Sequence, residues 1–61
     1  MKVVLHDPKP IPLQETVRLY QRISSSMGRE STVEARYADG RRGWTVEIDA
    51  AGRITRQGET V

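Results

Sequence analysis

The chain contains no cysteine and no phenylalanine, and only one histidine and one tryptophan. The missing cysteines exclude disulfide bonds and cysteine-ligated zinc sites, and a cysteine-free chain fits a reducing compartment. The longest strictly apolar run, Val3 to Leu5, is far shorter than the roughly 20 residues of a membrane-spanning helix. We therefore expect a cytoplasmic protein that makes no use of a membrane.

A large charge excess is also missing. Lysine and arginine total 10 and aspartate and glutamate total 8, so the net charge is +2 even though the sequence pI is about 9.5. The high pI reflects a small surplus of arginine rather than a basic stripe, and charge alone gives little support for nucleic-acid binding. At 61 residues the chain is one small domain, and a domain of this size buries only about 60% of its unfolded surface.

No catalytic constellation is visible. His6-Asp7 is the only histidine–carboxylate neighbourhood, and a general base needs a nucleophile and an orienting group within reach. We interpret His6-Asp7 as a solvated pair in a loop. The sequence therefore predicts a protein that is not an enzyme and has no catalytic residue, no cofactor and no metal site.

The stretch from Ser31 to Gln57 predicts a three-stranded antiparallel meander. Apolar and polar residues alternate along it, as they do in half-buried strands. Asp39-Gly40 lies between the first two strands and is a strong hairpin signal, so we predict a two-residue type I′ turn there. The predicted strands are residues 31–38, 41–49 and 53–57.

The type I′ turn implies a register for this hairpin. Tyr37 would face Arg42, and Ala35 would face Trp44. We also expect the Arg42 guanidinium to stack on the Tyr37 ring at the rim of the domain. All large apolar side chains of the hairpin then share one sheet face. That face comprises Val33, Ala35, Tyr37, Trp44, Val46 and Ile48.

A second turn supports the same buried face. Ala50-Ala51-Gly52 predicts a three-residue loop closed by a G1 bulge, with Gly52 in the left-handed conformation. This loop would pair Ile48 with Ile54 on the apolar side and Glu47 with Thr55 on the polar side.

One helix is predicted from about Pro12 to Met27. Pro12 suits the first helical position, because its missing N–H would be unpaired there, and Gly28 suits the residue after the last turn. Apolar residues recur at helical spacing and predict one core-facing stripe. The stripe comprises Leu13, Val17, Tyr20 and Met27, with Thr16, Leu19 and Ile23 on its shoulder.

These elements predict a single α+β domain over residues 1–61, in the order β-α-β-β-β, with the meander packed against one amphipathic helix. The remaining segments are a short strand at 2–5, a proline-rich connector at 6–12 and a frayed tail at 58–61. The 2–5 strand would lie at a sheet edge, parallel to the 31–38 strand, if the helix forms a right-handed crossover. Pairing with the 53–57 strand or with a neighbouring molecule is the alternative.

The open strand edges favour a small binding or regulatory protein that acts through protein–protein contacts. The sequence does not identify the protein partner. A homodimer is one expectation, since small domains with open edges often associate. The alternative is a nucleic-acid-binding protein that uses arginines on the helix face or the sheet.

Arg18 and Arg22 are one turn apart on the predicted polar face of the helix, near Glu15. The sheet arginines are interleaved with acidic residues, which argues against a continuous track for phosphates. The candidates for contact with a protein partner or a nucleic acid are Arg18, Arg22, Arg29, Arg36, Arg41 and Arg53.

The chain also shows a family resemblance. Val33-Glu-Ala-Arg-Tyr37 and Trp44-Thr-Val-Glu-Ile-Asp-Ala-Ala-Gly-Arg-Ile54, following the predicted helix, are similar to the PepSY-type repeat of bacterial secreted proteins. The similarity covers roughly the last two-thirds of the chain and consists of generic hairpin residues. The start of the chain has no export-signal pattern, which departs from the usual setting of that family.

Overall fold

The computed structural model describes residues 1–7 and 13–60, without the side chains of Leu13 and Thr60. The predicted connector from residue 8 to residue 12, the predicted helical position of Pro12, the predicted burial of Leu13 and the tail residue Val61 lie outside the described residues. The elements are β1 (Lys2–His6), α1 (Leu13–Met27), β2 (Ser31–Arg36), β3 (Gly43–Ile48) and β4 (Ile54–Thr60).

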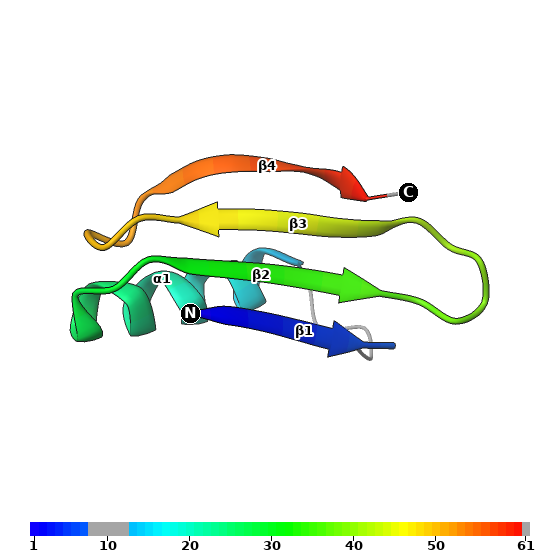
Figure 1. Ribbon diagram of the computed structural model, residues 1–61, viewed down its shortest axis with the longest axis horizontal. Coiled ribbons are helices and arrows are strands. Elements are labelled where there is room, and N and C mark those ends of the chain that lie inside the picture. The colour runs from blue at the N-terminus through cyan, green and yellow to red at the C-terminus, as the bar shows by residue number, and fades with distance from the viewer. Residues whose placement is uncertain (8–12, 61) are drawn as a thin grey trace.

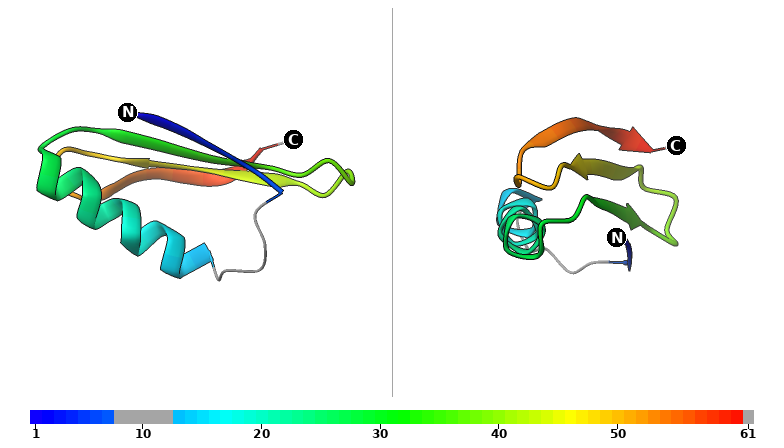
Figure 2. Two further views of the ribbon diagram at one scale, coloured as in Figure 1. Left: turned by 90° about the horizontal axis from the view of Figure 1, so that it is seen from below. Right: turned by 60° about the vertical axis from the view of Figure 1, so that its left-hand side comes forward.

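The four strands form one mixed sheet in the order β1-β2-β3-β4 (Figure 1). The β1 strand is parallel to β2, and the β2–β3 and β3–β4 pairs are antiparallel. The predicted α+β class, the β-α-β-β-β order and the edge position of the first strand are confirmed. Figure 2 shows α1 lying across one face of the sheet, so the fold has two layers, and none of residues 1–7 and 13–60 covers the opposite sheet face.

Several predicted boundaries differ from the structure. The first strand extends one residue further, to His6. The two hairpin strands are shorter than predicted, because β2 ends at Arg36 and β3 begins at Gly43 and ends at Ile48. The predicted frayed tail is wrong up to Thr60, because β4 continues to that residue by pairing with β3.

The register of the first hairpin is the predicted one, although its turn is not. Ala35 pairs with Trp44 and Val33 pairs with Val46. A type I′ turn requires positive φ at both loop residues, and only Gly40 of the two has it (φ 85°). The Asp39 side chain instead accepts the Arg41 backbone N–H at Oδ1 over 3.0 Å, and this bond holds a wider loop.

The second turn is closed as predicted. Gly52 has φ 87°, and the backbone N–H of Asp49 donates to the Arg53 carbonyl at 2.9 Å. The Asp49 carboxylate accepts backbone N–H groups from Ala51 and Arg53 at 2.9 and 2.8 Å. The turn is therefore stabilised by its own aspartate, in addition to the glycine that the sequence indicated.

The pairing beyond this turn differs from the prediction. Ile48 pairs with Ile54 as expected, but Glu47 pairs with Arg56, so Thr55 is the extra residue of a β-bulge. Without the bulge, Arg56 would lie over the core on the helix side. The bulge moves Arg56 to the uncovered face, where it pairs with Glu47. It also makes the neutral Gln57 the cross-strand neighbour of Val46 on the helix side.

The hydrophobic core is small. Tyr20 and Trp44 pack against it while remaining partly exposed. Burial of a valine or isoleucine side chain stabilises the fold by about 1.5–3 kcal/mol, so a core of this size gives limited stability. The buried apolar residues are Val17, Val33, Ala35, Val46 and Ile48.

The helix is attached to the sheet at its C-terminal end by a buried polar contact. The hydroxyls of Ser24 in α1 and Ser31 in β2 are hydrogen-bonded, and both residues are almost fully buried. Gly28 adopts φ 63° and the Arg29 N–H donates to the Ser24 carbonyl at 3.2 Å, which is a Schellman termination. The predicted helix-terminating role of Gly28 is thus confirmed.

The predicted apolar stripe of the helix is only partly buried. Val17 is in the core and Ile23 is half-buried, whereas Leu19 and Met27 are 52% and 54% exposed. The helix is rotated so that Gln21 and Ser24 also face the sheet or its β3–β4 turn. This rotation leaves Leu19 and Met27 on a flank of α1 without cover from the described residues.

Candidate functional site

A groove lies between α1 and the turn that joins β3 to β4. It has a volume of about 520 Å³ and continues into a second groove of about 400 Å³ between α1 and β4, since Arg18 and Gln21 line both. We call this combined surface the β4 groove. Its lining residues are Gln14, Val17, Arg18, Gln21, Arg22, Ser25, Ser26, Ala51, Gly52, Ile54 and Gln57.

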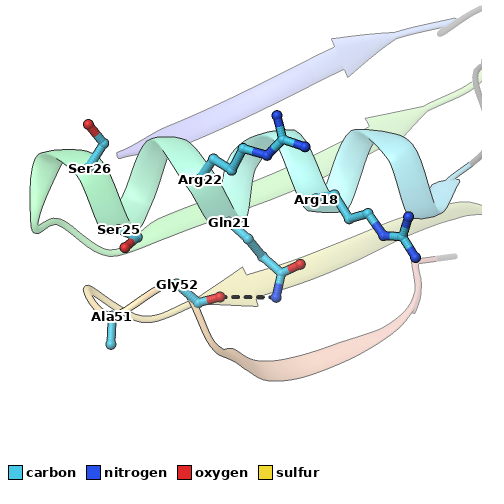
Figure 3. A pocket seen from close by; sticks show the side chains of 7 residues that line it. All are labelled: Arg18, Gln21, Arg22, Ser25, Ser26, Ala51 and Gly52. Carbon is cyan, nitrogen blue, oxygen red and sulfur yellow. Dashed lines mark hydrogen bonds between the residues drawn. The ribbon is translucent and has the colours of Figure 1, made fainter.

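The turn contacts the helix directly at the base of the β4 groove. The Gln21 side-chain amide donates to the Gly52 carbonyl at 3.0 Å (Figure 3). A Cβ atom added at Gly52 would lie 2.8 Å from the Gln21 carbonyl oxygen and 3.1 Å from Ser25 Cβ. Gly52 therefore has two structural roles. It adopts the left-handed conformation of the turn, and its missing side chain allows the turn to approach the helix backbone.

Two arginines form the charged part of the groove. Figure 3 shows the side chains of Arg18 and Arg22 extending along α1 toward its N-terminal end. Within the described residues, no carboxylate lies within 4 Å of either guanidinium. Like charges at positions i and i+4 destabilise a helix by about 0.2–0.5 kcal/mol, so an anionic ligand would relieve this repulsion.

The other candidate arginines lie elsewhere. Arg36 is on the uncovered sheet face and pairs with Glu34 at 3.3 Å, and Arg41 is at the hairpin tip. Arg29 follows the helix, and Arg53 is exposed at the start of β4. The structure therefore brings only Arg18 and Arg22 together among the six predicted contact residues.

The hairpin tip has its own charged cluster. Arg41 Nε binds Asp39 Oδ2 at 2.6 Å, and the Arg41 guanidinium lies 4.4 Å from the centroid of the Tyr37 ring. The Arg41 backbone N–H lowers the pKa of the Asp39 carboxyl below its ordinary value, and the Arg41 side chain adds to this effect. The predicted stacking of Arg42 on Tyr37 is wrong, because Arg42 instead pairs with Glu59 at 3.3 Å.

The opposite edge of the sheet is apolar. Val3 and Leu5 share the helix-side face of β1 with their β2 partners Val33 and Ala35, and Val4 lies on the uncovered face. All three β1 residues are only half-buried. Since Gln21 marks the flank of α1 nearer to β4, helical geometry places Leu19 and Met27 on the other flank. We call Val3, Val4, Leu5, Leu19 and Met27 the β1 edge surface.

Hydrogen bonds hold β1 at both ends. Thr32 N–H donates to the Met1 carbonyl at 2.7 Å, and Asp7 N–H donates to the Arg36 carbonyl at 2.7 Å. Asp7 has a positive φ of 45°, and its Oδ1 accepts the Ala38 N–H at 2.8 Å. The interpretation of His6-Asp7 as a solvated loop pair is confirmed in that both residues are exposed and Asp7 lies outside the strands. It is wrong for His6, which is the last residue of β1.

Sequence reasoning missed the contribution of Gln21, Ser25 and Ile54 to the candidate site. Gln21 and Ser25 lie three positions after Arg18 and Arg22, at a spacing that places residues side by side on a helix. That signal was present in the sequence. The contact between the helix and Gly52 depends on how the layers pack, and no local pattern indicates it.

Comparison of the chain with protein-family models, curated proteins and solved structures gives no match. No family model therefore supports the similarity of the hairpin residues to the PepSY-type repeat. Among the described residues, no helix is both long enough and apolar enough to cross a membrane.

Proposed function

We propose that this protein is a small non-enzymatic binding and regulatory protein that acts through protein–protein contacts and forms a homodimer. The observation that carries the proposal is the β1 edge surface, an apolar edge strand beside an apolar helix flank. Edge strands of monomeric proteins are usually protected by charges, prolines or bulges. The three central residues of β1 are apolar, and Lys2 is the only lysine, arginine or carboxylate in this strand.

A second copy of the chain is a suitable occupant of this surface. Antiparallel pairing of β1 with its counterpart, centred on Val4, places Val3 of one copy opposite Leu5 of the other. The two sheets then join into one, and twofold symmetry brings both helices to the same face. The exposed flank with Leu19 and Met27 is thereby directed toward the same flank of the second copy.

The exposed area of the chain supports this arrangement. The accessible surface is 4638 Å², whereas a compact monomer of 6.9 kDa exposes about 4,000 Å². The chain thus exposes roughly 600 Å² more than a compact monomer of its mass would. Dimerisation would thus compensate for the small core.

Several potential catalytic groups have structural roles, which supports a non-enzymatic function. The three aspartates of the chain are Asp7, Asp39 and Asp49. Each accepts at least one backbone N–H at a turn or at the end of a strand. These bonds use the carboxylates to stabilise the chain and to connect its loops.

Sedimentation equilibrium over a range of protein concentrations tests the homodimer. We expect the unchanged chain to dimerise at micromolar concentration and the variant Leu19→Glu/Met27→Glu to remain monomeric, because four buried carboxylates would repel across the twofold axis. The matched control, Arg18→Glu/Arg22→Glu, adds two glutamates to the other flank and should dimerise like the unchanged chain. A monomer at high micromolar concentration would overturn the proposal.

Nucleic-acid binding is the second candidate, and the unpaired guanidinium groups of Arg18 and Arg22 favour it. Two phosphate contacts would give a weak, salt-dependent interaction. Binding of labelled duplex DNA and RNA at two salt concentrations tests this candidate. Affinity that is absent at low salt, or that does not fall as salt increases, would exclude it. The separation of Arg29, Arg36 and Arg41 from the groove makes protein binding the better-supported function.

A further inference from the structure

The β4 groove differs from the β1 edge surface because arginine and polar side chains line it together with apolar ones. On the helix-side face, Ile54 is 41% exposed although it is paired with the buried Ile48. Gln57 lies on the same face, two residues after the bulge position Thr55. The helix packs against β2 and β3, so the helix-side face of β4 remains largely open.

The charge on this side of the domain is positive. Arg18 and Arg22 line the groove, and Arg53 is exposed directly before β4, whereas Arg56 is exposed on the uncovered face of that strand. Within residues 1–7 and 13–60, none of these four side chains forms an ion pair. Glu59 is the acidic residue of β4 in the described range, and it pairs with Arg42 at the far end of the strand.

The geometry suits an extended polypeptide. A strand added to the outer edge of β4 obtains its main-chain hydrogen bonds from that edge. Its alternate side chains, about 7 Å apart, point to the helix side of the sheet. One such side chain can cover Ile54, and neighbouring ones on the same face can reach the guanidinium groups of Arg18 and Arg22.

We propose that the β4 groove binds an extended acidic segment of a partner protein, which adds to the edge of β4 and places carboxylates against Arg18 and Arg22. This inference rests on the proposed protein-binding function and names the partner chemistry at a surface separate from the dimer interface. Arginine binds carboxylates through paired N–H donors, and the exposed Ile54 adds an apolar contact that a free anion would not use.

Fluorescence polarisation tests the proposal with a labelled peptide whose every second residue follows the order glutamate, valine, glutamate, with threonines between them, so that the valine and both glutamates share one strand face. We expect saturable binding that weakens as salt increases. The variant Arg18→Gln/Arg22→Gln should bind at least about tenfold more weakly, the equivalent of losing roughly one charge-assisted contact. The control Arg29→Gln removes an exposed arginine outside the groove and should change the affinity by less than about twofold.

Two peptide controls separate charge from strand addition. Replacing every glutamate of the probe with glutamine should abolish binding, and replacing the central valine with proline should weaken it strongly, because proline disrupts strand pairing. Equal binding of the glutamine or proline peptides would overturn the proposal. Complete displacement of the probe by duplex RNA or DNA at equal concentration would overturn it in favour of a nucleic-acid ligand.

Failure of this inference is distinguishable from failure of the dimer. A variant of the β1 edge, Val4→Lys, should be monomeric and should still bind the acidic peptide, because Val4 is not on α1 or β4. Amide shifts in its NMR spectra should be confined to β4 and the adjacent flank of α1. Shifts that occur in β1 instead would contradict the assignment of the peptide to the β4 groove. Lack of dimerisation with retained peptide binding would contradict only the homodimer.

Discussion

The two edges of the sheet differ in polarity, in charge and in the regularity of their strands. The β1 edge has Val3, Val4 and Leu5 in sequence and lies beside an apolar helix flank. The β4 edge has Arg56 and Glu59, contains a bulge and lies beside two arginines of α1. Only the second edge has charges and a bulge that usually prevent pairing with a second copy of the same edge, and its positive charge remains compatible with an added acidic strand. An apolar edge suits a permanent interface, and a charged one suits an exchangeable ligand.

The edges also differ in how they are attached to the rest of the fold. Backbone hydrogen bonds and the Asp7 carboxylate attach β1 to β2. Among the described residues, α1 packs more extensively on β2 and β3 than on β1. The β4 edge is connected to α1 through Gly52 and Gln21. The following predictions test this difference, beginning with the substitution of largest expected effect.

Replacing Gly52 with alanine should give the largest destabilisation. The substitution forces a left-handed conformation on a residue with a Cβ atom, and that atom would approach the Gln21 carbonyl to 2.8 Å. We expect the free energy of unfolding to fall by about 3 kcal/mol, from backbone strain and overpacking together. Urea denaturation followed by the fluorescence of Trp44 measures this change.

Gly40→Ala is the matched control for Gly52→Ala. Gly40 also has a positive φ of 85°, but a Cβ atom there meets nothing within 4 Å. Only the strain of about 1 kcal/mol should remain. Equal effects of the two substitutions would show that the approach of the turn to α1 contributes nothing to stability.

Replacing Asp7 with alanine should have an intermediate effect. It removes the acceptor for the Ala38 N–H and leaves a residue less tolerant of the positive φ. We expect a loss of about 1 kcal/mol in unfolding free energy, together with faster hydrogen exchange of the Ala38 amide. Asp7→Asn retains an acceptor and the backbone tolerance, so a loss as large as that of the alanine variant would contradict this role.

Replacing Gly58 with threonine should have the smallest effect, and in the stabilising direction. Gly58 pairs with Thr45 in the interior of β4, and a Cβ atom there meets nothing within 4 Å. Because glycine in a strand costs about 0.5–1 kcal/mol, we expect a gain of that size in unfolding free energy. Thermal denaturation measures it, and a lower melting temperature would contradict the open geometry of the β4 edge.

Much of the fold could be predicted because local rules agreed with one another. The alternation of apolar residues from Val33 to Ile48 defined the buried face, and the β2–β3 register followed from it even though the predicted turn type was wrong. A slip of one residue would have exposed the whole apolar set, so the register tolerates an error in the turn. The termination of the helix at Gly28 was likewise a local property.

The bulge at Thr55 and the rotation of α1 could not be predicted in this way. Either register of β4 satisfied the turn chemistry of Gly52, and the observed one pairs Gln57 instead of Arg56 with Val46. The burial of Ser24 with Ser31, and the exposure of Leu19, depended on how the helix lies across the sheet. Apolar periodicity limits that orientation only to a broad arc.

The sequence by itself determined the class of this domain, the order of its elements and the face that its hairpin buries. These properties follow from alternation, helical spacing and turn residues, which act over a few neighbouring positions. The tertiary structure decided that the other candidate arginines lie apart from the pair on α1 and that the two sheet edges are unlike. Those properties depend on the orientation of α1 and on the pairing of β1 and β4, which arise from contacts between distant parts of the chain.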